Sequence, residues 1–206
     1  MEYADIVAWL KTVQAHNSRE WYMQNKEMFR EIHGALNDLY FAVGNELRKK
    51  ADIDINPRKS ISRPYNDQRF GNKPYLRDNL WVTFQSEKCP KPAFFIEFSS
   101  YGIRIGMGYY AATPEQMRRM RMKIDDNPQK FLKIVEKVLE NRDIHRMGDT
   151  YKRKLSSNYE GLLEEIYNLR NIYFQKIILP EEWSELEQTS GGIFAELVPV
   201  YDLLRE

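Results

Sequence analysis

The chain has 206 residues, of which 42% are hydrophobic, and its 31 basic and 30 acidic side chains give a formal net charge of +1. This hydrophobic content excludes a disordered chain, and no apolar run approaches the roughly 18 residues that a membrane span needs. A charge this close to zero argues against a dedicated DNA- or RNA-binding module, so nucleic acid is not predicted as a partner. The length fits a single domain, residues 1–206, because chains divide commonly only beyond about 250 residues.

Composition also bears on location and charge. The N-terminal Met-Glu-Tyr-Ala-Asp has acidic residues where a signal peptide needs a basic and then an apolar segment, and the single Cys89 cannot form an internal disulfide. These features predict a cytoplasmic protein without a membrane association. From Glu181 to Glu206 seven acidic residues stand against Arg205, so this tail carries −6 and the rest of the chain +7. The tail either shields the basic part within the fold or leaves it to recruit an anionic ligand.

The N-terminal part of the chain predicts two helices. The first runs from Tyr3 to Ala15, because apolar residues recur there at helical spacing, namely Ile6, Val7, Leu10 and Val13. Asn17, followed three places later by Glu20, has the form of an N-cap with a reciprocal acidic partner and begins a longer helix that continues to about Lys50. Its buried stripe is predicted to be Tyr22, Phe29, Ile32, Leu36, Leu39, Val43 and Leu47.

Three segments alternate apolar and polar residues, as the strands of a half-buried antiparallel sheet do. They are Leu80-Val82-Phe84, Phe94-Ile96-Phe98 and Ile103-Ile105-Met107. Ser99 to Gly102 predicts a tight connection between the last two, and Ser60 to Tyr65 is a candidate fourth strand that Pro64 confines to an edge or an end. Gly106 and Gly108 lie on one side of their strand, which lets another backbone or a ligand approach closely.

The second half of the chain predicts further helices. Thr113 and Asn127 each place a capping side chain before a proline in a first helical turn. Residues 142–158 are polar and irregular. Leu162 to Leu169 predicts a helix, whereas the run from Ile172 to Leu179 fits either a strand or a continuation of that helix. Pro180 begins an acidic helix, Gly191-Gly192 interrupts it, and Ile193 to Leu204 closes the chain with a kink at Pro199.

The order of these elements predicts the fold class. Two helices, then three or four strands, then more helices indicate an α+β fold, with an antiparallel sheet of about four or more strands and helices packed on one face.

The stretch from Ser60 to Tyr75 is the strongest candidate for a functional site. It gathers polar and aromatic side chains in one segment that lacks a helical period: Arg63, Tyr65, Asp67, Arg69, Lys73 and Tyr75. If the segment runs extended, residues at every second position project from the same side. The guanidinium groups of Arg63 and Arg69 would then bind a phosphate or carboxylate bidentately, while the Asp67 carboxylate holds one of them in place.

Two further cations are assigned to this pocket. Lys73 follows the glycine turn Phe70-Gly71-Asn72 and precedes Pro74, so it sits at a loop tip above the arginines. Arg121 comes from the basic helix after Thr113, whose other cations are expected to face solvent.

A structural interpretation competes with the functional one. In it, Asp67 pairs with Arg63 or Arg69 at the base of the loop, Lys73 touches nothing, and no ligand is needed. The protein would then be a non-catalytic interaction module whose basic surface meets an acidic partner.

Standard catalytic and cofactor motifs are missing from the sequence. His16, His33 and His145 are scattered without metal-ligand spacing, and Cys89 lies beside Pro90 with no adjacent histidine to activate it. No phosphate-binding P-loop, nucleophile elbow or zinc helix is present. We therefore predict no metal and no cofactor, and the sequence leaves open whether the protein is an enzyme.

Four stretches of the chain resemble an uncharacterised, largely bacterial family, domain of unknown function 2461. They are Leu10 to Phe29, with its Asn-x-Arg-Glu-Trp-aromatic-x-x-Asn-Lys pattern; Ile61 to Tyr75; Gly106 to Ile124, with Pro114 and Arg121; and Gly148 to Lys154. The resemblance implies one α+β domain and no assigned activity. The family loop usually reads Arg-x-Tyr-Arg-Asp-x-Arg-Phe-Ser, then a charged pair and Pro-Tyr-Lys. This chain departs from it at Asn66, Gly71, Asn72 and Leu76, and so lacks an arginine and a lysine of that pattern.

Overall fold

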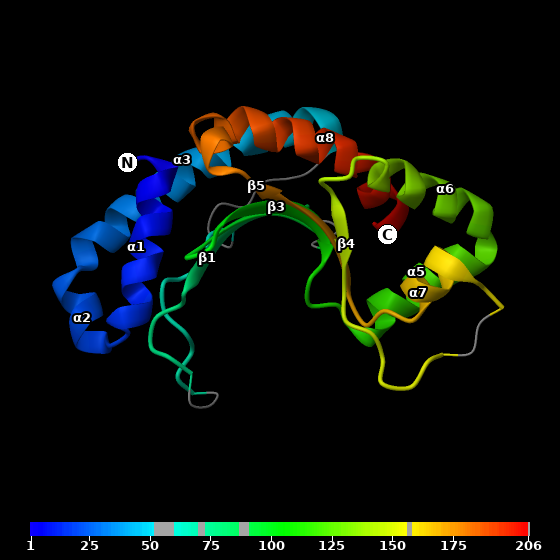
Figure 1. Ribbon diagram of the computed structural model, residues 1–206, viewed down its shortest axis with the longest axis horizontal. Helices are drawn as coiled ribbons and strands as arrows, with labels where there is room; N and C mark the ends of the chain where they lie inside the picture. The colour runs from blue at the N-terminus through cyan, green and yellow to red at the C-terminus, as the bar shows by residue number, and fades with distance from the viewer. Residues whose placement is uncertain (52–59, 70–72, 87–90, 156–157, 206) are drawn as a thin grey trace.

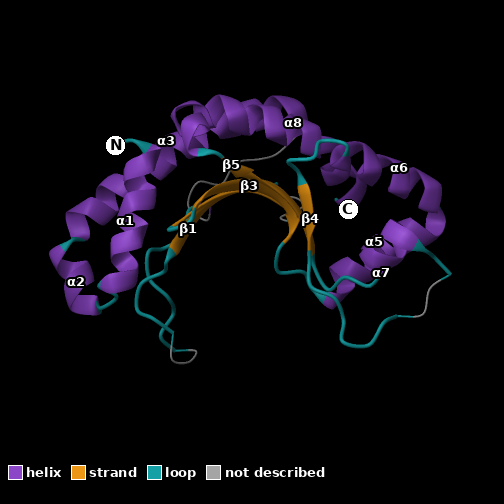
Figure 2. Ribbon diagram, in the orientation of Figure 1, coloured by secondary structure: helices purple, strands orange, loops and turns teal. Residues whose placement is uncertain are grey.

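The computed structural model describes residues 1–51, 60–69, 73–86, 91–155 and 158–205. Within these ranges a curved antiparallel sheet carries helices on its convex side, while loops flank its concave side (Figure 1). The predicted α+β class is confirmed, as is the placement of helices on one face (Figure 2). No helix in the described part of the chain has the length and apolar content needed to cross a bilayer.

The sheet has five strands within the described residues, in the order β1-β2-β3-β5-β4. Their bounds are β1 Asn79–Phe84, β2 Ala93–Ser99, β3 Gly102–Tyr109, β4 His145–Met147 and β5 Ile172–Ile178. The three strands predicted from alternation are confirmed, and all neighbours pair antiparallel. The undecided run after Ile172 is a strand that lies between β3 and β4, and β4 itself falls in a segment that was expected to be irregular.

The helices are α1 Tyr3–Ala15, α2 Arg19–Gln24, α3 Lys26–Ala51, α5 Pro114–Asp126, α6 Pro128–Leu139, α7 Gly161–Tyr167 and α8 Leu186–Leu204, with a 3₁₀ helix, η1, at Pro180–Glu185. Helices α3 and α8 cover the convex face (Figure 1). There Tyr40 of α3 stacks on Phe84 with ring centroids 5.3 Å apart, and Phe194 of α8 packs edge-on against Phe94 at 5.0 Å. These buried rings anchor both helices to the sheet.

Three helix predictions need correction. The helix predicted from Asn17 is divided at Asn25 into α2 and α3, and its N-cap is Ser18, whose hydroxyl accepts from the Trp21 backbone N–H. Gly191-Gly192 does not interrupt the last helix, which continues through both glycines and contains Pro199. By contrast, Thr113 and Asn127 cap α5 and α6 as predicted, and Thr113 forms a capping box with Gln116.

Strand alternation gives the concave face its own set of side chains. Positions 80, 82 and 84 of β1 are buried under the helices, whereas Asn79, Trp81 and Thr83 point to the other side and are only partly buried. In register with them lie Glu97 opposite Trp81, Phe95 opposite Thr83, and Arg104 opposite Glu97. We call this surface the open face; it comprises the outward positions of β1, β2, β3 and β5, namely Asn79, Trp81, Thr83, Phe95, Glu97, Arg104, Gly106, Gly108, Tyr173 and Gln175.

Candidate functional site

The predicted polar loop forms an arm beside the β1 edge of the sheet. Ile61 bridges Val82, and the Ser62 backbone N–H donates to the Trp81 carbonyl at 2.9 Å. The chain then returns on itself, since Tyr65 bridges Leu76. The candidate fourth strand at Ser60 to Tyr65 is therefore an isolated bridge on an edge, and the glycine turn predicted at residues 70–72 lies outside the described residues.

Arg69 pairs with Asp67 instead of opening toward a ligand. Its Nε and Nη2 donate to the two carboxylate oxygens at 3.0 and 2.6 Å, and its backbone N–H also donates to Asp67 Oδ1 at 3.1 Å. These side-chain and backbone hydrogen bonds hold the pKa of Asp67 well below its usual range. This half of the loop has the internal pairing that the structural interpretation expects.

Arg63 lies near Arg77, which the sequence interpretation did not single out. The positive charge of Arg63 lowers the pKa of Arg77, after the larger lowering that comes from burial. Arg77 lies over the Trp81 ring, 4.7 Å from its centroid, and Arg63 lies over the Tyr65 ring at 5.6 Å. Among the described residues neither guanidinium forms an ion pair, and the buried Nε of Arg77 has no hydrogen-bond acceptor.

The two tyrosines of the loop serve packing. Tyr65 and Tyr75 meet Tyr22 of α2, with the three ring centroids 5.9 to 6.2 Å apart. Burial and the two neighbouring phenols raise the pKa of Tyr22. Lys73 is exposed at the end of the loop. The structure thus gathers Arg63, Tyr65 and Tyr75 at the base of the arm and leaves Lys73 at its end.

Arg121 does not join the loop. Its Nη1 donates to the carbonyl oxygens of Tyr167 and Leu169, both at 3.4 Å, and its guanidinium lies 5.8 Å from the Tyr151 ring centroid. Helix α5 stands at the opposite end of the sheet from the arm (Figure 1). Arg121 therefore ties α5 to the segment that leads into β5, and it contributes nothing to a pocket at the arm.

A cavity of about 350 Å³ opens on the open face beside Arg77. Its lining combines aromatic and polar side chains from β1 and β2 with the end of β3: Arg77, Asn79, Trp81, Thr83, Lys91, Ala93, Phe95, Glu97, Gly108, Tyr110 and Ala111. A second cavity of about 330 Å³ shares Asn79 and Glu97 with it, so the two adjoin along the sheet. Concave sites of this size, with apolar walls and few polar groups, are typical of small-molecule binding.

The negative charge on the floor of these cavities is compensated. Arg104 Nη2 donates to Glu97 Oε2 at 2.9 Å and lies 2.8 Å from Oε1 in an ion pair, and Arg104 Nη1 donates to Gln175 Oε1 at 3.2 Å. Burial lowers the pKa of Lys91 at the rim. With Glu97 paired, the basic side chains Arg63, Arg77 and Lys91 give this end of the face its electrostatic character.

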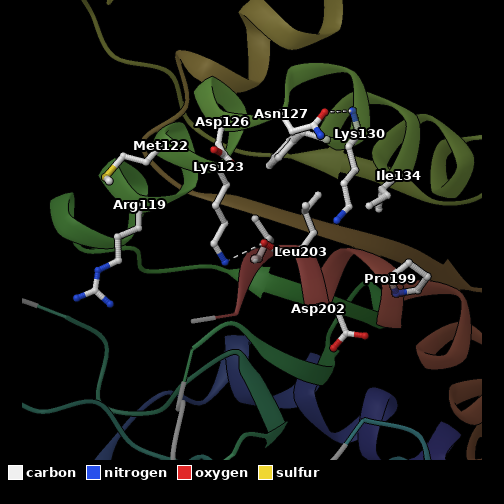
Figure 3. A pocket seen from close by; sticks show the side chains of 12 residues that line it. Arg119, Met122, Lys123, Asp126, Asn127, Lys130, Ile134, Pro199, Asp202 and Leu203 are labelled. Atoms are coloured by element: carbon white, nitrogen blue, oxygen red, sulfur yellow. Dashed lines mark hydrogen bonds between the residues drawn. The ribbon is translucent and has the colours of Figure 1, made fainter.

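A larger cavity, of about 740 Å³, lies elsewhere, between α5, α6 and the C-terminal end of α8 (Figure 3). Its rim carries charges of both signs, and its Lys123 donates to the Leu203 carbonyl at 3.1 Å and to that of Arg205. Arg119 pairs with Glu115 at 3.0 Å. Because Lys123 and Arg119 already have these partners, the cavity has no concentration of charge of one sign. We therefore place the candidate site on the open face. In the described residues no group of three His, Cys, Asp or Glu side chains could hold a metal ion.

Sequence reasoning missed most of this face. A signal was present in β1, where Trp81 occupies a position of the opposite parity to the buried Leu80, Val82 and Phe84. A tryptophan on the outward side of a strand is a large apolar group without an assigned partner, which is a reason to expect a binding surface. Arg77 had no such signal, because it precedes the strand in sequence and reaches Trp81 only in the fold.

The described residues define an α+β protein whose antiparallel sheet has one face under helices and one face open, with an arginine pair and aromatic rings along it. A profile of the conserved hypothetical proteins called domain of unknown function 2461 matches residues 5–202, nearly the whole chain. The chain therefore belongs to this family. No curated protein and no solved structure matches it.

Proposed function

We propose that the open face binds a small molecule bearing a phosphate or carboxylate group, and that Arg63 and Arg77 hold this group. The observation that carries the proposal is the state of Arg77. Its guanidinium lines the cavity, lies near a second arginine, and lacks an ion pair among the described residues, while its Nε is buried without an acceptor. The cytoplasmic location expected from the sequence would give such a site access to phosphorylated metabolites.

Electrostatics supports an anion at this position. Two like charges brought together and partly desolvated destabilise the fold unless a counter-charge offsets them. A phosphate or carboxylate would supply that charge and satisfy the planar donors of a guanidinium bidentately. Arg69 does not share this role, because its donors already meet the Asp67 carboxylate.

The second candidate function is a non-catalytic interaction module. The bidentate pair of Asp67 and Arg69 favours it, since that pair braces the loop without a ligand. In this alternative Arg63 and Arg77 would meet an acidic group of a partner protein. Small anions would then bind weakly or not at all.

Thermal unfolding with added anions tests the proposal. The wild-type protein is titrated with inorganic phosphate and a panel of phosphorylated and carboxylated metabolites, beside Arg77→Met and Arg63→Met, which keep an apolar stem and remove the charge. Ligand at about 100 times its Kd should stabilise the wild type by about 2.7 kcal/mol. Both variants should lose this response, and without ligand Arg77→Met should be no less stable than the wild type, because an unpaired, partly buried charge has been removed.

Arg69→Met is the matched control, since it removes a loop guanidinium that is already paired and exposed. It should respond to anions as the wild type does. The proposal is abandoned in favour of the interaction module if no anion raises the melting temperature, or if Arg77→Met responds as strongly as the wild type.

A further inference from the structure

We infer that the anionic ligand of the open face is a nucleotide, with its base in the cavity beside Trp81 and Phe95 and its phosphate at Arg63 and Arg77. This inference rests on the proposed function and names its ligand class. The cavity has two features that a simple anion would not use: aromatic walls and an amide with unused hydrogen-bonding groups.

Aromatic rings form the walls of the cavity. Trp81, Phe95 and Tyr110 all line it, and Tyr110 is 56% exposed. Tyr173 connects the last two, with its ring centroid 6.3 Å from Phe95 and 5.3 Å from Tyr110. Trp81 and Phe95 are partly buried, and Arg77 lies over the Trp81 ring. Aromatic rings gathered in a concavity are the usual platform on which nucleic-acid bases stack, because every base has a flat π face.

Two glycines of β3 let neighbouring groups pack directly against its backbone. A Cβ on Gly106 would lie 2.6 Å from Phe95 Cζ and closer still to the Phe174 carbonyl oxygen. The tip of the Phe95 ring therefore lies against bare backbone. Gly108 lines the cavity with φ at +149°, a conformation that other residues rarely adopt. A Cβ on Gly108 would clash with the Ile172 carbonyl oxygen. Both glycines are therefore required by the close packing of β3 against its neighbours.

Asn79 supplies the polar edge. Its side chain lines both cavities, and among the described residues its amide has no hydrogen-bond partner. A free amide offers one acceptor and two donors in a plane, which matches the adjacent donor and acceptor on the edge of a base such as adenine. Glu97 and Thr83 are less available, because Glu97 pairs with Arg104 and Thr83 Oγ1 donates to the Ser60 carbonyl.

The spacing of the anion site and the ring site fits one short ligand. Arg77 belongs to the cavity lining, and its guanidinium lies 4.7 Å from the Trp81 ring centroid. One small molecule can therefore place a phosphate at Arg77 and a ring of its own between the aromatic side chains. A base and a phosphate joined by one sugar have this compact arrangement. The cavity volume of about 350 Å³ lies in the lower part of the range for small-molecule sites, roughly 300–1,000 Å³.

Calorimetric titration with matched fragments tests the inference. The four ribonucleoside monophosphates are compared with ribose 5-phosphate, which lacks the base, and with the four nucleosides, which lack the phosphate. At least one nucleotide should bind the wild-type protein tenfold or more tightly than ribose 5-phosphate does. Trp81→Leu should weaken binding of that nucleotide at least tenfold more than binding of ribose 5-phosphate, which it affects only through the contact of Arg77 with the ring, whereas Arg77→Met should weaken both ligands.

The outcomes separate this inference from the proposed function. If ribose 5-phosphate binds as tightly as every nucleotide, the base site is refuted and the anion site stands. If neither the nucleotides nor ribose 5-phosphate bind, both fail. Trp81→Phe keeps an aromatic ring in a smaller volume and is the control in case the leucine variant does not fold. Its preference for the nucleotide over ribose 5-phosphate should lie between those of the wild type and Trp81→Leu. Equal nucleotide affinity in Trp81→Phe, Trp81→Leu and the wild type would also overturn the inference.

Discussion

The side-chain amide of Asn17 pairs with both backbone polar groups of Leu76. Its Nδ2 donates to the Leu76 carbonyl at 3.0 Å, and its Oδ1 accepts from the Leu76 N–H at 2.6 Å. One side chain thus imitates a neighbouring strand and fastens the returning strand of the arm to the junction of α1 and α2. Leu76 is buried, so its N–H would otherwise lack water as well as a partner, whereas its carbonyl also accepts from Asn66 Nδ2 at 3.3 Å.

Asn17→Ala should therefore lower the free energy of unfolding by about 1–3 kcal/mol, the usual cost of leaving a buried donor, here the Leu76 N–H, unpaired. It should also weaken anion binding, because Arg77 directly follows Leu76. Urea titration and phosphate titration measure the two effects. Asn45→Ala, at an exposed position of α3, is the control and should be neutral or slightly stabilising. Equal stability of the two variants would show that the Asn17 bridge contributes nothing.

Gly106→Ala is expected to lower the free energy of unfolding by about 1–3 kcal/mol, since overpacking at a site lined by backbone cannot be relieved by rotating a side chain. The added methyl would meet the Phe174 carbonyl oxygen and the Phe95 ring. Guanidinium chloride titration gives the change. The same substitution at Gly34 is the control, because nothing lies within 4 Å of a Cβ there. Because alanine has a higher helix propensity than glycine, Gly34→Ala should raise the free energy of unfolding by about 0.5–1 kcal/mol. A Gly106 variant as stable as wild type would contradict the close packing.

The elements that sequence predicted well are those with local signals. Helices α5 and α6 begin at a capping side chain followed by proline, and both features act within one turn. Strand β5 could not be assigned, because its apolar run fits both types and its pairing with β3 and β4 decides the matter. Helix α8 continues through Gly191-Gly192 because Ile193 and Phe194, which follow, are buried in the core, and that burial outweighs the low helix propensity of glycine.

The candidate site could be predicted only in part, because it too depends on contacts between segments distant in sequence. The alternation argument paired Arg63 with Arg69, but the Asp67 carboxylate accepts from both the backbone and the side chain of Arg69, which makes a local turn and neutralises it. Arg63 instead approaches Arg77, since the Arg77 N–H donates to the Pro64 carbonyl across the arm at 2.9 Å. A contact between segments that far apart in sequence has no signature in local spacing.

Lys123→Met should destabilise the protein by about 1 kcal/mol. The ammonium of Lys123 donates to the Leu203 and Arg205 carbonyls at the C-terminal end of α8, where unpaired carbonyls and the helix dipole favour a cation (Figure 3). Chemical unfolding of this variant is compared with that of Lys133→Met, an exposed position on α6. The control should stay within about 0.5 kcal/mol of wild type. Indistinguishable midpoints for the two variants would remove Lys123 from the account of how α8 is held.

Tyr3 should make stability fall at alkaline pH. Its hydroxyl donates to Glu187 Oε1 at 2.9 Å, and burial, followed by this hydrogen bond and the charge of Glu187, raises the pKa of Tyr3 above its ordinary value of 10.0. A raised pKa in the folded protein means that the unfolded chain loses the proton first. The contribution of Tyr3 is therefore complete below about pH 10 and declines as the pH rises above it.

Tyr3→Phe tests this dependence when unfolding is measured between about pH 8 and pH 11. The wild type should be more stable than the variant by at most about 1 kcal/mol at the lower pH, because the hydrogen bond is exposed, and the difference should shrink as the pH rises. Tyr101→Phe, at a position that is 92% exposed, should follow the wild-type curve throughout. A difference between wild type and Tyr3→Phe that stays constant across the range would mean that Tyr3 and Glu187 are not coupled through the phenolic proton.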